Sequence, residues 1–280
     1  MNVIAAVRAE FAKIMTVRLW WVLLLVLAGY VAFTAGILAL AFSGLGGALG
    51  SPGGDPAGGG MPGIPDGALP PIIYSIASSI GYVFPVLLGT LATTVEFRHQ
   101  TLTPTFLATP RRGVVLGAKY LVLLGFGAVF GLGGLVASVG LGAPILAATG
   151  HETGLGDSDI WLLLARIVLA MAIWAIIGVG LGALIPSQVA AIVIVLAFTQ
   201  FVEPILRLVA SFWDWTAGIG QFLPGAAGDA LVGSSIFTTL GGMSPDAQAL
   251  DWWQGGLVLL AYALIAGAVG YATSWRRDVT

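Results

Sequence analysis

Three charged residues lie within long stretches that are otherwise apolar: Arg166, Glu203 and Arg207. An ionised side chain in apolar surroundings must be paired or reach water, and inside a membrane it marks a substrate or ion pathway by default. Glu203 and Arg207 are four residues apart, so they share one face of a helix. Arg166 and Glu203 fall at comparable depths in their stretches, and we predict that they form an ion pair. Alternatively, Arg166 and Arg207 extend separately to lipid headgroups.

Hydroxyl side chains precede a proline in another apolar stretch, at Ser75, Ser78, Ser79 and Pro85. A proline near the centre of a membrane helix removes a backbone hydrogen bond and predicts a kink. The hydroxyl groups would line a polar translocation pathway, or would mediate an ordinary contact between helices through small residues. The sequence leaves both interpretations open.

Residues suited to catalysis or metal binding are scarce. The chain has no cysteine, and its two histidines, His99 and His151, fall on opposite sides of a membrane in the topology predicted below. An active site needs several convergent groups, and no such cluster is visible. We expect no catalytic residue, no cofactor site and no metal site in this chain, so a membrane enzyme is the least supported interpretation.

The composition and the placement of basic residues predict a multi-spanning membrane protein. Apolar residues make up 58% of the 280 residues and charged residues only 9%, against roughly 25% in a soluble domain. About 20 apolar residues cross a bilayer as a helix, and six stretches qualify: 20–42, 72–95, 114–138, 160–184, 189–209 and 254–274. All Lys and Arg residues except Arg166 and Arg207 then fall on one side, which is the cytoplasm by the positive-inside rule. We predict an all-α protein of the plasma membrane, in contact with lipid and with both termini cytoplasmic.

The first segment, 1–19, is predicted to be an amphipathic helix. It places Val3, Val7, Phe11 and Ile14 at spacings of three or four, with charged residues on other faces. Such a stripe would lie in the cytoplasmic membrane interface.

The two external segments have different patterns. Residues 43–71 are rich in Gly and Pro and predict a mobile loop. Residues 210–253 carry Trp213, Trp215, Trp252 and Trp253, whose rings favour the headgroup level. We interpret this segment as one or two re-entrant helices that enter the outer leaflet.

The cytoplasmic segment 96–113 is charged and contains Pro104 and Pro110. Residues 105–109 predict a short helix that ends near Pro110, because the residue before a proline disfavours the helical conformation. A short helix between two spans with flanking charges is suited to docking a soluble partner. Alternatively, its basic residues only bind anionic headgroups.

This segment resembles the loop between spans two and three in the permease subunits of ABC-2 type exporters. That loop has a Glu, one or two basic residues, Gly-Thr, an apolar turn, Thr-Pro, a basic residue and Gly-Lys at the start of span three. The sequence departs from it at Gln100, where Gly usually precedes the Thr, and at Ala118, which separates Gly117 from Lys119. The matching residues are Glu96, Arg98, Thr101, Leu107, Thr109, Pro110, Arg112, Gly117 and Lys119.

The resemblance implies a non-catalytic transmembrane subunit of a bacterial ABC exporter. Two permease chains, identical or related, would pair with two cytoplasmic ABC ATPase subunits that bind ATP and Mg²⁺, and no nucleic acid is involved. The sequence itself lacks the G-x-x-x-x-G-K-[ST] motif of a phosphate-binding loop. The substrate would be amphipathic or hydrophobic, such as a drug, a peptide or a lipid.

Segment 96–113 would contain the coupling helix of this exporter, with Phe106 and Leu107 as the apolar anchor in the ATPase. The full set of residues expected at that contact is Glu96, Arg98, Thr101, Phe106, Leu107, Pro110, Arg111 and Arg112. The main alternative function is an ion-coupled secondary transporter that uses Arg166 and Glu203. Such a transporter would show broken helices at corresponding positions of two repeats, and the sequence shows no convincing repeat.

Overall fold

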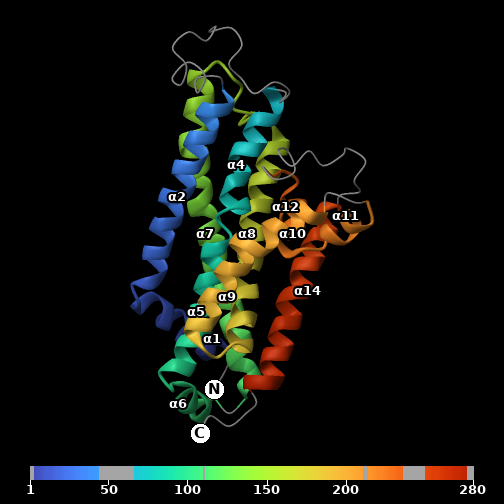
Figure 1. The fold of residues 1–280 in the computed structure, drawn as a ribbon. Helices are drawn as coiled ribbons and strands as arrows, with labels where there is room; N and C mark the ends of the chain where they lie inside the picture. Colours follow the sequence, from blue (N-terminus) through green and yellow to red (C-terminus); the bar gives the residue numbers. More distant parts are fainter. Residues whose placement is uncertain (1–2, 44–65, 110, 211–213, 236–249, 276–280) are drawn as a thin grey trace.

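Six helical spans are long and apolar enough to cross a membrane, which confirms the predicted all-helical class and the number of spans. The computed structural model describes residues 3–43, 66–109, 111–210, 214–235 and 250–275, and this part of the chain contains no β-strand. The architecture is that of a multi-pass membrane protein (Figure 1). The spans are α2 (Leu19–Phe42), α4 with α5 (Leu69–Ser79, Val83–Arg98), α7 (Arg112–Ala148), α8 (Ser158–Leu184), α9 with η2 and α10 (Gln188–Ala197, Phe198–Val202, Glu203–Ala210), and α14 with η3 (Trp252–Gly270, Tyr271–Trp275).

The centre of the bundle is formed by α5 and α8, and α7 and α14 pack against α8 on its other sides. Glycines allow the closest approach, because a Cβ atom at Gly89 would meet the backbone of Ala175 and one at Gly178 would meet that of Val86. Thr90 also donates a hydrogen bond to the carbonyl oxygen of Gly178 at 3.1 Å. Small residues therefore bring α5 and α8 into backbone contact, as is common between membrane helices.

Two spans are interrupted next to prolines. The kink predicted at Pro85 is present as a break between α4 and α5 at residues 80–82. Pro85 is the third residue of α5, where an N–H group would have no helical partner in any case. In the fifth span, the π-helical turn η2 directly precedes α10, whose second residue is Pro204. Proline cannot donate the hydrogen bond that would continue a regular α-helix, which explains the widened turn.

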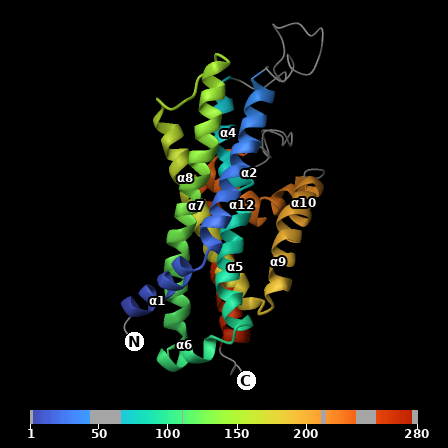
Figure 2. The same ribbon diagram turned by 90° about the vertical axis from the view of Figure 1, so that its left-hand side faces the viewer.

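One end of the bundle gathers α1 (Val3–Thr16), α6 (Leu102–Ala108), the start of α7 and the end of η3, as Figures 1 and 2 show. From this end α7 runs to Ala148, beyond the predicted limit at residue 138. We call it the basic end, because the segments that meet there carry Arg8, Lys13, Arg18, Arg98, Arg111, Arg112 and Lys119.

Away from the basic end, α10, α11 (Asp214–Gly220) and α12 (Pro224–Val232) lie beside the bundle (Figure 1). α12 packs against α14, α8 and α4 and buries Ala227, Leu231 and Val232. The segment predicted to be re-entrant is therefore helical in part. Its residues 236–249, like residues 44–65 of the predicted loop, lie outside the described residues.

Candidate functional site

The short helix predicted between the second and third spans is present as α6, which begins at Leu102 rather than at residue 105. Pro104 is its third residue, so the proline lies in a first turn that tolerates it. Leu102 is fully buried, and Phe106 packs edge-on against Trp275 with ring centroids 5.6 Å apart. Leu107, in contrast, is 79% exposed. One side of α6 is thus fixed to the bundle, and the other presents Leu107.

The turn from α5 into α6 is made by Gln100, which has a φ of +55°. Its N–H donates to the carbonyl oxygen of Phe97 at 3.3 Å, and the N–H of Thr101 donates to that of Glu96 at 3.1 Å. These two bonds form the Schellman motif, in which glycine is the usual left-handed residue. The departure from glycine at Gln100 therefore leaves the tight turn in place, at the expense of a strained conformation.

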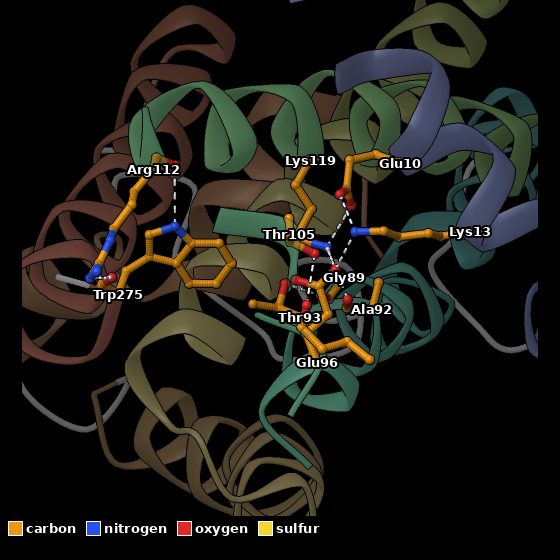
Figure 3. A network of polar contacts seen from close by, with 11 residues as sticks. Glu10, Lys13, Gly89, Ala92, Thr93, Glu96, Thr105, Arg112, Lys119 and Trp275 are labelled. Carbon is orange, nitrogen blue, oxygen red and sulfur yellow. Dashed lines mark hydrogen bonds and ion pairs between the residues drawn. The ribbon is translucent and has the colours of Figure 1, made fainter. Parts of the chain in front are cut away.

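Trp275, at the end of the last span, fixes the position of α6. Its fully buried ring donates from Nε1 to the carbonyl oxygen of Arg112 at 3.2 Å, and Arg112 Nη1 donates to the carbonyl oxygen of Trp275 at 3.2 Å (Figure 3). The ring also packs against Phe97 at 5.8 Å, and the Arg112 guanidinium lies 4.9 Å from the ring centre of Phe106. The end of the last span and the start of α7 thus hold α6 in place, although they are far apart in the sequence.

Four charged side chains join α1 to α5 and α7 at the basic end (Figure 3). Lys119 Nζ lies 2.6 Å from Glu10 Oε2 and 3.2 Å from Glu96 Oε1, and Lys13 Nζ lies 2.6 Å from Oε1 of both carboxylates. Lys119, Glu10 and Glu96 are at most 4% exposed, whereas the side chain of Lys13 is 41% exposed. We call these residues the four-charge cluster. Two cations balance two carboxylates, which is the condition for burying them.

The two α1 members of this cluster have shifted pKa values. Burial alone would raise the pKa of Glu10, but the ammonium groups of Lys119 and Lys13 hold that pKa below its ordinary value. Burial alone would lower the pKa of Lys13, but the carboxylates of Glu96 and Glu10 keep that pKa above its ordinary value. Both residues are therefore held in their charged forms.

The four-charge cluster lies on the face of α1 that contacts the bundle. Val3 and Phe11 of the predicted apolar stripe are about half exposed, whereas Ile14 of the same stripe is buried together with Ala6 and Glu10. The sequence placed Glu10 outside the stripe but did not predict that it is buried. The pairing with Lys119 explains its burial, since a paired carboxylate can be buried.

The remaining residues of the predicted coupling set have separate positions. Arg98 Nη1 donates to Gln188 Oε1 at 3.0 Å, which links the end of α5 to the start of α9. Thr101 and Arg111 are exposed on either side of α6. Pro110 lies outside the described residues. Among the described members of the predicted set, only Leu107 combines an apolar side chain with high exposure.

The intramembrane charges form a different network from the predicted one. Arg207 Nη2 lies 3.3 Å from Glu203 Oε1, and Arg207 Nη1 lies 2.6 Å from Asp229 Oδ2 on α12. Glu203 Oε1 also accepts a hydrogen bond from the N–H of Gly225, near the start of α12. We call Glu203, Arg207 and Asp229 the acid–arginine cluster. It fastens α10 to α12, and Ser79 extends it to α4 by donating to Asp229 Oδ1 at 3.1 Å.

The predicted ion pair between Arg166 and Glu203 is not formed. The guanidinium of Arg166 instead lies 4.8 Å from the ring centre of Trp252, at the start of α14. Glu203 is already bonded to Arg207 one helical turn away and to α12, which is why it does not meet α8. Arg166 therefore makes a cation–π contact, which needs no carboxylate partner.

The candidate pathway residues are buried inside the bundle. Ser75 and Ser78 donate to carbonyl oxygens of their own helix, at 2.8 and 3.0 Å, and Pro85 is buried in α5. Ser79 alone reaches another charged side chain, Asp229. Ser78 lines a small cavity together with Tyr82, Trp174 and Asp229.

The sequence did not predict three members of these clusters. Asp229 is a single acid in an apolar helix, and Glu10 and Lys13 are charged residues of an amphipathic helix for which only the apolar stripe was expected to make contacts. An isolated charge in an apolar run was the available signal for Asp229, and it is the same signal that singled out Glu203. Among the described residues, no group of three or more His, Asp or Glu side chains could hold a metal ion.

No family model matches this chain, and neither does any curated protein.

Proposed function

We propose that this chain is the permease subunit of an ATP-driven ABC exporter in a bacterial plasma membrane. The observation that carries the proposal is α6, a short helix whose buried side is held by Trp275 and whose free side presents Leu107. An exposed apolar side chain on a fixed support is what a docking helix needs, because apolar anchors dominate interface energies and preorganisation lowers the entropy lost on binding.

In this proposal the partner is a cytoplasmic ABC ATPase, and two ATPase subunits with ATP and Mg²⁺ serve two permease chains. The basic end faces the cytoplasm, in accord with the positive-inside rule. Leu107 enters the ATPase, and the exposed Arg98 and Arg111 set the register at the rim. Phe106 packs against Trp275 of the same chain and so supports α6, which leaves Leu107 alone as the apolar anchor in the ATPase.

The transported substrate is amphipathic or hydrophobic in this proposal, and this chain carries out no hydrolysis. α1 lies in the cytoplasmic interface with Val3 and Phe11 toward lipid, and α12 belongs to a segment that enters the membrane from outside. The alternative, an ion-coupled secondary transporter, would use Arg166 and Glu203, which do not contact each other among the described residues.

Co-purification tests the proposal. The full chain is co-expressed with the ABC ATPase encoded nearest to its reading frame, and the tagged chain is isolated with any bound ATPase. Leu107→Asp should abolish recovery of the ATPase while leaving the helical content unchanged. Val17→Asp is the matched control, because Val17 is also an exposed apolar residue at the basic end but lies outside α6. Transport by the purified chain alone, driven by an ion gradient, would contradict the proposal.

A further inference from the structure

The acid–arginine cluster contains more negative than positive charge. Glu203 and Asp229 are two carboxylates, their side chains are 2% and 7% exposed, and Arg207 is the one cation bonded to both. With every group ionised, the cluster would have a net charge of −1. The four-charge cluster at the basic end has the same number of buried carboxylates but two ammonium groups.

Among the described residues, no cation other than Arg207 is bonded to the acid–arginine cluster. Arg166 and Arg207 are the only basic residues outside the segments that gather at the basic end and the chain's C-terminal residues. The guanidinium of Arg166 lies against Trp252. The other titratable side chains that face Glu203 are the neutral phenols of Tyr82 and Tyr262, from the α4–α5 break and from α14.

One oxygen atom of the cluster has no bonding partner. Glu203 Oε1 accepts from Arg207 and from the N–H of Gly225, whereas the buried Glu203 Oε2 has no hydrogen-bond partner within the described part of the chain. The Tyr82 hydroxyl faces Glu203 but donates to the carbonyl oxygen of Thr199 at 3.3 Å. A buried carboxylate oxygen without a donor is costly when it is ionised, and a proton on that oxygen removes both the charge and the cost.

We propose that the acid–arginine cluster is a proton-binding site, at which Glu203 and Asp229 together hold one exchangeable proton. The bound proton neutralises the site, because two carboxyl groups with one proton carry the single negative charge that Arg207 balances. Because both carboxyl groups are bonded to the same guanidinium, their protonation is coupled, and the proton belongs to the pair rather than to one residue. The inference goes beyond the exporter function and does not depend on it.

In this proposal a water molecule in the adjoining cavity and nearby hydroxyl groups would deliver the proton to Asp229. The cavity is lined by Ser78, Tyr82, Trp174 and Asp229, among others, and it has room for about one water molecule. Ser79 donates to Asp229 at 3.1 Å and lies 3.4 Å from the hydroxyl of Ser235. Hydroxyl groups both donate and accept, so they can pass a proton to a carboxylate.

Proton release would loosen the contact between α10 and α12. Once the proton has left, the buried site carries an uncompensated charge between α10, α12 and α4, and the packing of these helices is weakened. The arrangement of the helices away from the basic end should therefore depend on pH, while the balanced four-charge cluster holds the basic end together.

Infrared spectroscopy of the full chain in lipid nanodiscs tests the proposal. At neutral pH in potassium buffer, a protonated carboxyl group gives a carbonyl stretching band that shifts in heavy water. We expect this band in the native chain and its loss in both Glu203→Gln and Asp229→Asn, because either change removes the excess charge. Glu96→Gln is the matched control: Glu96 is also buried with an unbonded Oε2, but in a balanced cluster, and this variant should keep the band.

Two results would overturn the proposal. The first is a native spectrum without the band, or a band that persists in either Glu203→Gln or Asp229→Asn when that variant is folded. The second is a band that appears only when sodium is withdrawn, since this would show that a metal cation rather than a proton occupies the site. The two variants test the same claim separately, so the loss of fold in one still leaves the other decisive.

Discussion

The two buried charge clusters use similar groups with different balance. The four-charge cluster pairs two carboxylates with two ammonium groups and joins α1, α5 and α7. The acid–arginine cluster sets two carboxylates against one guanidinium and joins α10, α12 and α4. A cluster whose charges balance keeps its helices packed together, whereas a cluster with an excess negative charge can bind and release a proton. The basic end should therefore stay fixed, while the packing of α10, α12 and α4 should depend on pH.

The largest effect is expected from removing the buried cation of the balanced cluster. Lys119→Met leaves two buried carboxylates with only the half-exposed Lys13 beside them, and the free energy of unfolding should fall by about 3–5 kcal/mol. Lys13→Met is the control and should lower it by about 1 kcal/mol or less, since exposed pairs contribute little. Chemical denaturation in mixed micelles measures both values. Equal losses in the two variants would show that burial does not distinguish the two lysines.

Neutralising one carboxylate should change the free energy of unfolding differently in the two clusters. Glu96→Gln unbalances the four-charge cluster and should lower the free energy of unfolding by about 1–3 kcal/mol. Glu203→Gln removes the excess charge of the acid–arginine cluster, and its effect should stay within about 1 kcal/mol of the native chain. A larger loss of unfolding free energy in Glu203→Gln than in Glu96→Gln would contradict the proposed difference in charge balance.

Acid should release α1 from the basic end. The folded pKa of Glu10 lies below its ordinary value of 4.5, so its contribution to stability is complete above that value. The contribution is lost as the pH falls through the lowered, folded-state pKa. A spin label on Ala9→Cys, in a chain that has no other cysteine, should become mobile in that range. In Glu10→Gln the label should show no such transition, and an identical transition there would assign it to another group.

A smaller effect is expected at the turn that precedes α6. Gln100→Gly relieves the left-handed strain, and after the entropy that glycine loses on folding the net gain should be about 0.5–1 kcal/mol. Gln100→Ala keeps a Cβ atom and should give no gain. Thermal unfolding of the three chains compares them, and a destabilised glycine variant would mean that the Gln100 side chain has a role of its own.

The smallest effect concerns the pair that the sequence predicted. Arg166 and Glu203 share no partner in the structure, so the effects of Arg166→Ala and Glu203→Ala should add to within about 0.5 kcal/mol in the double variant. A coupling well above that value would show that the two charges meet after all.

The spans were predictable because length and apolar composition act locally along the chain. The break near Pro85 was predictable for the same reason, since proline alters the backbone at its own position. The partners of the charges were not predictable. Whether Glu203 contacts Arg166 or is joined to Asp229 through Arg207 depends on how α12 packs against α8, and this packing brings together residues that are distant in sequence.

The sequence also could not show which side of α6 faces the bundle. Phe106 and Leu107 are neighbours of similar character, and a short helix offers too few residues for an apolar stripe to appear. The ring of Trp275 fixes the orientation of α6 by packing on Phe106, and Trp275 lies at the end of the last span, far from α6 in the sequence.

The contact of Trp275 with Arg112 also has a consequence for biosynthesis. Trp275 leaves the ribosome after the first five spans, so α6 lacks its support until the last span has been made and inserted. In the complex proposed above, a chain that still lacks its last span would therefore present α6 loosely and hold the ATPase poorly. Synthesis of the last span is in this way a condition for assembly of that complex, and chains that stop before Trp275 would be excluded from it.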